Sequence, residues 1–303
     1  MQPLYQEKLL AWYAHRGRAH LPWRADPSPY RVVVSEFMLQ QTQVERVIPA
    51  FERFIARFRS FAELAGASRA DVVRAWKGLG YNSRAVRLHE LARAVRDLHT
   101  GLLPSDEAAL RALPGVGPYT ARAIRAFTFN ADTIAIDTNV RRIVHRTQFG
   151  FEHPPRASDR ELDAIATALV PPKRAFEFNS ALMDLGATVC LARAPKCLIC
   201  PLRKHCAAAP LDAATLRAVA QTKRTTSPSK SVPFERTNRF LRGRVVDRLR
   251  ALPARRTISL LDLHAGLALS APHHDAQAIG VAIDALLREG LIERSRGGVR
   301  LRA

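Results

Sequence analysis

Four cysteines close together in the sequence have the residue type and spacing of a metal site. Cys190, Cys197, Cys200 and Cys206 form the pattern C-x6-C-x2-C-x5-C, and the sequence contains no other cysteine. The N-terminal stretch MQPLYQEKLLAWYAHRG lacks the basic-then-apolar pattern of an export signal, so we expect a cytoplasmic protein, in which structural disulfides are rare. Clustered thiolates therefore predict a bound metal. On these residues alone, a zinc ion with four cysteine ligands is an alternative to an iron–sulfur cluster.

A single acid within an apolar stretch is the second candidate for chemistry. Glu36 lies in VVVSEFMLQQTQVERVI (32–48), where apolar positions recur at helical spacing. We therefore expect one helix from Pro29 through this stretch, with Ser28 as its N-cap. A glutamate there is either solvent-exposed, which is commoner, or used in chemistry. The amides of QQTQ (40–43) on the same helix suit the reading of base edges, and a solvated helix surface is the alternative.

A glycine-rich turn, LPGVGPYTA (113–121), predicts two helices joined by a tight hairpin. Gly115 and Gly117 flank Val116, and Pro118 suits the first turn of the second helix. Glycines let the backbone approach a ligand closely, and free N–H groups at a helix N-terminus favour an anion. In a basic chain that anion is expected to be a nucleic-acid phosphate. An ordinary helix–helix connection is the alternative.

Two more residues stand at positions where chemistry or binding is expected. Asp137 is a lone aspartate directly after an apolar extended run. Tyr81 follows Gly78 and Gly80 on a predicted turn, where an aromatic ring could enter a base stack. The alternative for Tyr81 is a ring packed against its own turn.

The composition indicates a polyanionic partner. The chain of 303 residues carries a formal net charge of +20, with 47% hydrophobic and 24% charged residues. Such a charge favours DNA or RNA as partner, although arginine-rich codon usage contributes to it as well. The sequence has no run of about 18 apolar residues, so we expect no membrane span.

The C-terminal part reads as a separate unit. Residues 209–234 are polar and rich in proline and serine, which is typical of a linker. Residues 235–303 predict three helices followed by two short strands around Arg296-Gly297-Gly298, an arrangement that resembles a winged helix. Such a unit either packs against protein or contacts DNA phosphates. The basic side chains available for the second role are Arg294, Arg296, Arg300 and Arg302.

Six motifs in fixed order resemble the MutY-type adenine DNA glycosylases of the helix-hairpin-helix superfamily, over roughly residues 5–208. They are SEFMLQQTQV, GLGYNSR, LPGVGPYTARAI, IDTNVRR, ALMDLGATVC and the cysteine loop. The resemblance implies a mainly all-α fold with DNA in a cleft between two domains. The implied parts are a six-helix domain (18–134), a cluster domain (1–17 and 135–208), the linker (209–234) and the winged-helix-like domain (235–303).

The resemblance also implies a catalytic pair. Glu36 matches the family's catalytic acid and Asp137 its catalytic aspartate, while Tyr119 and Asn139 match residues that orient them. A carboxylic acid that is protonated at working pH can deliver a proton to a purine ring nitrogen and so improve the leaving group. An ionised carboxylate nearby stabilises the positively charged sugar or attacks it.

The remaining assignments come from the same resemblance. The four cysteines would hold a 4Fe–4S cluster. Bifunctional relatives such as endonuclease III carry a lysine at the position of Tyr119, and no lysine lies between Lys77 and Lys173, which implies a monofunctional enzyme. Residues implied to surround the flipped adenine or the opposite base are Arg24, Leu39, Gln41, Thr42, Leu79 and Tyr81, and those at the DNA backbone are Gly115, Val116 and Gly117.

The expected function is therefore hydrolytic removal of adenine mispaired with 8-oxoguanine or guanine in double-stranded DNA, by a cytoplasmic, nucleoid-associated monomer. One alternative is a related glycosylase for thymine or uracil opposite guanine, against which Glu36 in SEFMLQQT argues. Another is a non-catalytic iron–sulfur DNA-binding protein, which would need Glu36 or Asp137 to be absent. Many MutY proteins end in a larger, Nudix-like domain, which residues 235–303 do not resemble, so the preference between 8-oxoguanine and guanine stays open.

Overall fold

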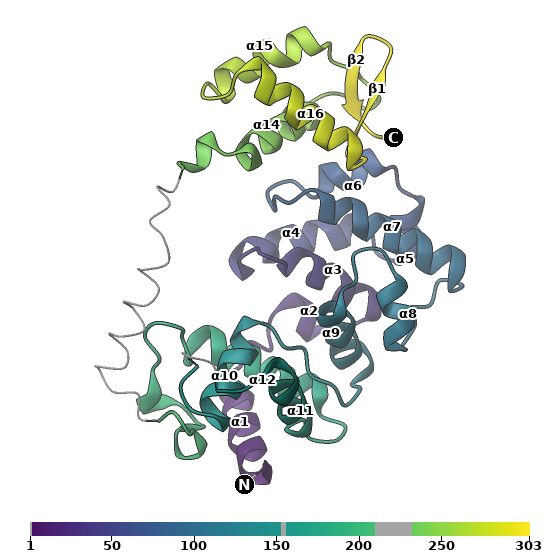
Figure 1. Cartoon of the computed structure of the whole chain (residues 1–303). Coiled ribbons are helices and arrows are strands. Elements are labelled where there is room, and N and C mark those ends of the chain that lie inside the picture. The colour runs from purple at the N-terminus through teal and green to yellow at the C-terminus, as the bar shows by residue number, and fades with distance from the viewer. Residues whose placement is uncertain (1, 153–155, 210–231) are drawn as a thin grey trace. The chain divides into compact units, whose positions relative to one another are not determined.

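The computed structural model describes residues 2–152, 156–209 and 232–303 (Figure 1). The described chain is mainly helical, which confirms the expected fold class, and none of its helices is long and apolar enough to span a membrane. It divides into two compact units. The first comprises Met1–Val32, Ser105–Ala112 and Val116–Pro228, and the second Val33–Pro104, Leu113–Gly115 and Ser229–Ala303. The expected domain boundaries stay a prediction, and most of the expected linker lies outside the described residues.

The first unit is built on a core beneath the N-terminal helix. Buried side chains such as Leu9, Val144 and Phe178 form this core, joining α1, α10 and α12. The helices of the unit are α1 (Gln2–Arg16), α2 (Pro22–Ala25), α8 (Glu107–Ala112), α9 (Pro118–Phe129), α10 (Thr138–Gln148), α11 (Asp159–Ala168), α12 (Ala175–Thr188), η1 (Cys197–Ile199) and η2 (Arg203–His205).

The second unit combines helices from the middle of the chain with the C-terminal segment. Its largest fully buried side chains include Phe51, Phe54 and Trp76, and the rings of Phe54 and Trp76 meet edge to face. Its elements are α3 (Pro29–Leu39, which starts in the first unit), α4 (Val44–Arg57), α5 (Phe61–Gly66), α6 (Arg69–Ala75), α7 (Ser83–Leu98), η3 (Phe234–Arg236), α14 (Asn238–Arg250), α15 (Leu260–Ser270), α16 (Ala276–Arg288), β1 (Ile292–Ser295) and β2 (Gly298–Leu301).

The single helix expected through residues 32–48 is wrong, because the chain breaks between α3 and α4. The helix ends at Leu39, and Gln41 has a left-handed φ of 53°. The buried guanidinium of Arg84 donates to the carbonyl oxygens of Phe37 and Met38, both at 2.8 Å. It thereby occupies acceptors that a continuing helix would use, and a cation is favourable at a helix C-terminus. The QQTQ amides consequently lie in a turn and not on the helix.

Helix α5 is among the elements that were not expected from the sequence. Residues 61–66 form α5, which begins at Ser60, where the serine side chain accepts from the backbone N–H of Glu63. At six residues the helix is too short for its apolar spacing to stand out from the neighbouring pattern.

The C-terminal segment has the three helices and the terminal hairpin expected from the sequence. Strands β1 and β2 pair antiparallel, with Ser295 opposite Gly298 at the turn. Gly298 has a φ of 151°, and a Cβ there would lie 1.9 Å from the carbonyl oxygen of Ile258. Glycine is therefore required where β2 passes this backbone. A bridge between Ile258 and Val299 completes the wing.

Candidate active site and metal centre

The glycine-rich turn forms the expected hairpin between α8 and α9. Gly115 has a φ of 79°, and a Cβ there would lie 2.8 Å from the ring of Phe37 and 3.0 Å from Cβ of Arg87. Both the backbone angle and the close approach therefore require glycine. Gly117 precedes α9, with Pro118 in the first turn, and nothing lies within 4 Å of a Cβ added to it. The backbone at Gly117 is accordingly open to a ligand.

Glu36 is buried on α3, so the exposed alternative for it is wrong. Only 8% of the residue is exposed, and its neighbours Ser35 and Phe37 are each 1% exposed. The structure therefore removes this acid largely from solvent, within the second unit.

Arg84 organises the segment that follows Glu36, and the sequence analysis did not single it out. Its guanidinium donates to the side-chain oxygen of Thr42 at 3.0 Å and to the carbonyl oxygen of Leu79 at 3.1 Å. Burial lowers the pKa of Arg84 to about 10, so the group stays charged at neutral pH. The expected base-contacting residues of two distant segments are thus held together by one cation. Its place in the GLGYNSR motif was the available signal.

Tyr81 stands on a tightly wound turn. Gly78 and Gly80 have φ values of 91° and 68°, and Tyr81 itself has a φ of 43°. A left-handed conformation is costly for a bulky residue and marks a position that the surrounding structure holds in place. The Tyr81 ring is half-buried beside two guanidinium groups, those of Arg84 at 5.5 Å and Arg239 at 3.8 Å from its centroid.

Asp137 is the N-cap of α10, a helix start that the sequence analysis missed. One carboxylate oxygen accepts from the backbone N–H groups of Asn139 at 2.9 Å and Val140 at 2.7 Å. The other oxygen accepts from the Asn139 side chain at 3.1 Å. The structure therefore brings Asp137 and Asn139 together, and the helix N-terminus favours a negative charge at this point.

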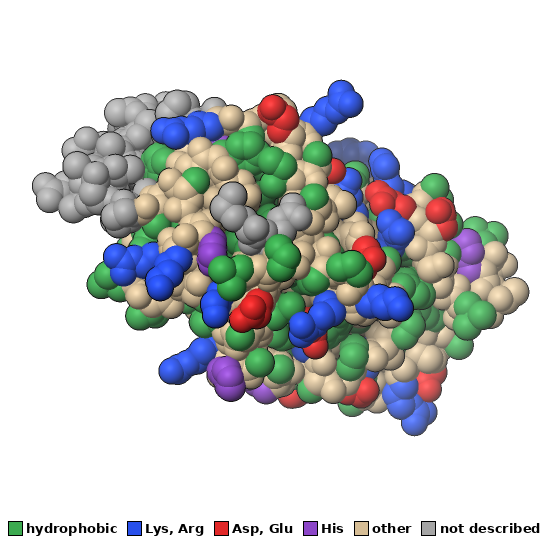
Figure 2. Space-filling model, turned by 90° about the horizontal axis from the view of Figure 1, so that it is seen from below, with side chains coloured by type: hydrophobic (Ala, Val, Ile, Leu, Met, Phe, Trp, Pro, Cys, Tyr) green, Lys and Arg blue, Asp and Glu red, His purple; other side chains and the backbone are tan. Residues whose placement is uncertain are grey.

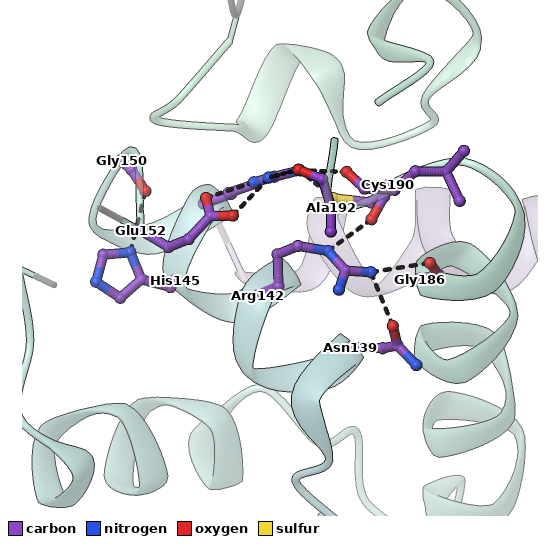
Figure 3. A network of polar contacts seen from close by, with 10 residues as sticks. Asn139, Arg142, His145, Gly150, Glu152, Gly186, Cys190 and Ala192 are labelled. Carbon is purple, nitrogen blue, oxygen red and sulfur yellow. Dashed lines mark hydrogen bonds and ion pairs between the residues drawn. The ribbon is translucent and has the colours of Figure 1, made fainter. Parts of the chain in front are cut away.

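A chain of hydrogen bonds leads from Asp137 through Asn139 to the cysteine loop, and Figure 3 shows the part of it from Asn139 through Arg142 to Cys190. Arg142 donates to the side-chain oxygen of Asn139 at 2.9 Å and to the carbonyl oxygen of Cys190 at 2.8 Å. It also donates to the carbonyl oxygen of Gly186, where an added Cβ would lie 2.6 Å from Asn139. Displacement of the loop would therefore be transmitted to the aspartate.

A second buried arginine holds the start of the cysteine loop. Arg146 is 1% exposed and donates to Glu152 at 2.6 Å and to the carbonyl oxygen of Leu191 at 2.8 Å. It also approaches the sulfur of Cys190 at 3.6 Å. The charged guanidinium thus holds the backbone carbonyl oxygens of the two residues that follow the first cysteine, Leu191 and Ala192, and lies next to the sulfur of that cysteine.

The four cysteines are free thiols that line one cavity of about 30 Å³. Burial raises the pKa of the Cys200 thiol to about 11 and also raises the pKa of Cys206. Within the described residues, no group of three or more His, Cys, Asp or Glu side chains is drawn together at metal-binding spacing. Four soft sulfur donors around one apolar cavity nevertheless fit a thiolate-ligated metal or cluster, and a cation would favour their ionised form.

Arg24 and Tyr119 have well-defined places in the first unit. Arg24 donates to both carboxylate oxygens of Asp184, at 3.0 and 2.9 Å, and Arg18 pairs with the same buried acid. Tyr119 lies in the first turn of α9 and packs against a cluster that includes Phe127. Glu36 belongs to the second unit, and the expected contacts of all these residues with DNA stay predictions.

Many basic side chains are paired with acids, so their charge is balanced locally. Arg125 pairs with Glu107 at 3.1 Å, and Arg122 pairs with Asp163. On the face shown in Figure 2, lysine and arginine side chains are spread out, and several lie beside Asp or Glu. Basic residues that have no acidic neighbour are therefore the better candidates for contacts with DNA phosphates.

Comparison with known proteins identifies the family. A family model described as "HhH-GPD superfamily base excision DNA repair protein" matches residues 34–172. An adenine DNA glycosylase from Mycolicibacterium smegmatis is 41% identical over 294 residues, which cover 96% of this chain and 93% of that protein. This chain belongs to the adenine DNA glycosylase family. The expected resemblance is confirmed, and the similarity extends well beyond the residues that the superfamily model matches.

Two further comparisons agree with membership of the adenine DNA glycosylase family. The adenine DNA glycosylase of Mycobacterium tuberculosis is 39% identical over 296 residues, covering 96% of this chain and 90% of that protein. The solved structure of a thermostable thymine-DNA glycosylase superposes with a TM-score of 0.62 at 29% identity, over 68% of this chain and 94% of that one. These two adenine DNA glycosylases therefore match a larger share of this chain than the thymine-DNA glycosylase does, and they match it at higher identity.

Proposed function

We propose that this protein is a monofunctional DNA glycosylase that removes adenine mispaired with 8-oxoguanine or guanine from double-stranded DNA. It acts as a monomer in the cytoplasm, at the nucleoid. The observation that carries the proposal is the burial of Glu36 on α3, in a chain that belongs to the adenine DNA glycosylase family. A non-catalytic DNA-binding protein would have no need to bury an acid at this position.

Glu36 is proposed as the general acid. The N-glycosidic bond to adenine is cleaved when the base departs with the bonding electrons, and a proton on a purine ring nitrogen makes that departure easier. Because the bond is inaccessible inside the duplex, the adenine must first be flipped out of the stack. The turns that carry Leu39, Gln41, Thr42 and Leu79 are proposed to receive it.

Asp137 is proposed as the carboxylate that balances the positive charge developing on the sugar. Its two oxygens are fixed by hydrogen bonds from Asn139 and Val140, so it requires little reorganisation during the reaction. Asn139 is in turn held by Arg142. Water then adds to the sugar carbon and loses a proton, either directly or after the carboxylate has formed a covalent intermediate that water hydrolyses, so that the carboxylate is regenerated.

The proposed reaction is tested by measuring base release from duplexes that carry A opposite 8-oxoguanine, A opposite G, T opposite G and U opposite G. We expect release of adenine only, with strand scission appearing only after alkali treatment. Borohydride should not trap a covalent complex, because Tyr119 replaces the lysine that would form a Schiff base. Excision of thymine in preference to adenine would show that the protein is a thymine glycosylase and not an adenine glycosylase. Trapping of a covalent complex by borohydride would contradict a monofunctional mechanism.

We infer that the four cysteines hold a 4Fe–4S cluster. Bound there, a cluster would fix the loop and so present its basic side chains to DNA phosphates. The side chains concerned are exposed and form no ion pair within the described residues: Arg193, Lys196, Arg203 and Lys204. Through Arg142, the same loop would support the position of Asp137.

Metal analysis tests this inference. Anaerobically purified protein should be brown and contain about four iron atoms per chain. Cys197→Ser should lower both the iron content and the soluble yield, because one of the four ligands is lost. Leu198→Ser is the matched control, since Leu198 is 83% exposed in the same loop and offers no thiol. Stoichiometric zinc without iron would show that the site is a zinc site.

A further inference from the structure

Three arginines from separate elements of the second unit come together where the C-terminal segment meets α6 and α7. Arg69 is the first residue of α6, Arg93 lies on α7, and Arg302 directly follows β2. We call these three residues the arginine cluster. The side chain of Arg69 is 13% exposed, whereas Arg93 and Arg302 are exposed residues. None of the residues proposed above for catalysis, for base contacts or for the metal centre belongs to the cluster.

The backbone at Gly290, between α16 and β1, brings two guanidinium groups of the cluster close together. Arg69 donates to the carbonyl oxygen of Gly290 at 3.1 Å. A Cβ built on Gly290 would lie 2.7 Å from Nη1 of Arg69 and 3.1 Å from Nη1 of Arg302. Both nitrogens therefore lie close to the same point, and one small anion can reach both of them.

A single carboxylate balances the charge of the arginine cluster. Glu90 on α7 accepts from Arg69 at 3.0 Å. The other two arginines of the cluster form no ion pair within the described residues. Asp97, one turn further along α7, is already paired with Arg96 at 2.6 Å. Three guanidinium groups thus face one carboxylate, which leaves an excess of positive charge.

Two buried groups are affected by this excess. Burial lowers the pKa of Arg69, Glu90 opposes the shift, and the other two arginines of the cluster lower the pKa further. His89, which is 3% exposed on α7, has its pKa lowered first by burial and then by Arg69 and Arg93. Like charges held together in a partly desolvated place are unfavourable unless an anion balances them.

The chemistry of the arginine cluster fits a phosphate group. A guanidinium group donates through a planar fork, and it pairs with phosphate through two parallel hydrogen bonds. The three arginines come from α6, from α7 and from the end of β2, so they approach from different directions. A tetrahedral phosphate presents oxygens in several directions, whereas a carboxylate presents its two oxygens in one plane. Approach from different elements therefore favours phosphate.

We propose that the arginine cluster binds a phosphate group, and that this group joins the C-terminal segment to α6 and α7. The phosphate bridges Arg302 and Arg69 and removes the repulsion between them, so its binding strengthens the attachment of the segment. A backbone phosphate of DNA and a free phosphate share this chemistry. The inference goes beyond the proposed glycosylase function and does not depend on it.

The test measures the unfolding temperature of the full-length protein while inorganic phosphate replaces chloride at constant ionic strength. We expect an increase of about 2–3 °C when phosphate exceeds its dissociation constant about tenfold, because the ligand stabilises only the folded state. Arg302→Gln should abolish most of this increase. Arg93→Gln should reduce it as well, and because both arginines are exposed, neither substitution should prevent folding.

Arg296→Gln is the matched control, since Arg296 is an exposed arginine without an ion pair in the described chain. It lies in the β1–β2 turn, at the opposite end of the hairpin from Gly290. This variant should respond to phosphate as wild type does, which also corrects for the general stabilisation of folded proteins by phosphate. Equal responses of wild type, Arg302→Gln and Arg93→Gln to phosphate would overturn the proposal.

A second measurement identifies the source of the phosphate group. The affinity of wild type and of Arg302→Gln for a fully paired duplex is measured as a function of salt concentration. If the ligand is a backbone phosphate of DNA, the substitution should lower the salt slope by about 0.9. A lost response to inorganic phosphate together with an unchanged slope would assign the site to free phosphate. Neither measurement involves base release, so a failure of the glycosylase function would not affect the result.

Discussion

Replacement of Glu36 by glutamine is expected to lower the single-turnover rate of adenine release by about 10²–10⁴-fold, the usual contribution of general acid catalysis. The amide has nearly the same shape but cannot donate a proton of suitable acidity to the purine. Because the residue is buried on α3, a substitution of equal volume should preserve the surrounding packing. Affinity for the mispaired duplex should therefore stay near that of wild type.

A control variant shows whether the effect is specific to Glu36. Glu45→Gln is the matched control, since Glu45 is an exposed glutamate in the first turn of the neighbouring helix α4. It should leave both the rate and the affinity unchanged. A Glu36→Gln variant that releases adenine at close to the wild-type rate would remove this residue from the mechanism.

Substitution of Asp137 by asparagine should lower the rate by at least about 10²-fold, the effect typical of losing one electrostatic contact to a transition state. A neutral amide cannot balance the positive charge that develops on the sugar. Asparagine is as good an N-cap as aspartate, so the start of α10 should be kept. The free energy of unfolding should consequently change little, which separates the chemical from the structural role.

Two further variants check this separation. Asp137→Ala removes the cap as well as the charge, and it should also lower the free energy of unfolding by about 0.5–2 kcal/mol. Asp275→Asn changes an aspartate with the same capping role on α16, in the C-terminal segment, and should not affect the rate. If Asp137→Asn and Asp275→Asn gave equal rates, the charge at Asp137 would not contribute to catalysis.

Several features could be predicted from the sequence alone because they depend on residues that are close together along the chain. The hairpin before α9 follows from a glycine at positive φ and a proline in the first helical turn, both local requirements. The three C-terminal helices and the β1–β2 hairpin follow from apolar spacing and from Gly297-Gly298. Family membership was predictable as well, because the motifs that carry it are continuous segments.

Tertiary structure decided the features that depend on contacts between distant residues. The break after Leu39 occurs because Arg84, far along the chain, occupies the carbonyl oxygens at the end of α3. No periodicity within residues 32–48 could reveal it. The burial of Glu36 was undecidable for the same reason, since only packing against other elements determines whether a turn of α3 meets water.

The contacts that arginine side chains make were the hardest features to predict from the sequence. Arg142 joins the cap at Asp137 to the cysteine loop, and Arg239 meets Tyr81 from the C-terminal segment. A long side chain with several donors can satisfy partners in any direction, so residue type and spacing do not indicate which partners it selects. The sequence indicated the kind of chemistry and predicted its residues, whereas the three-dimensional packing decided what holds those residues in place.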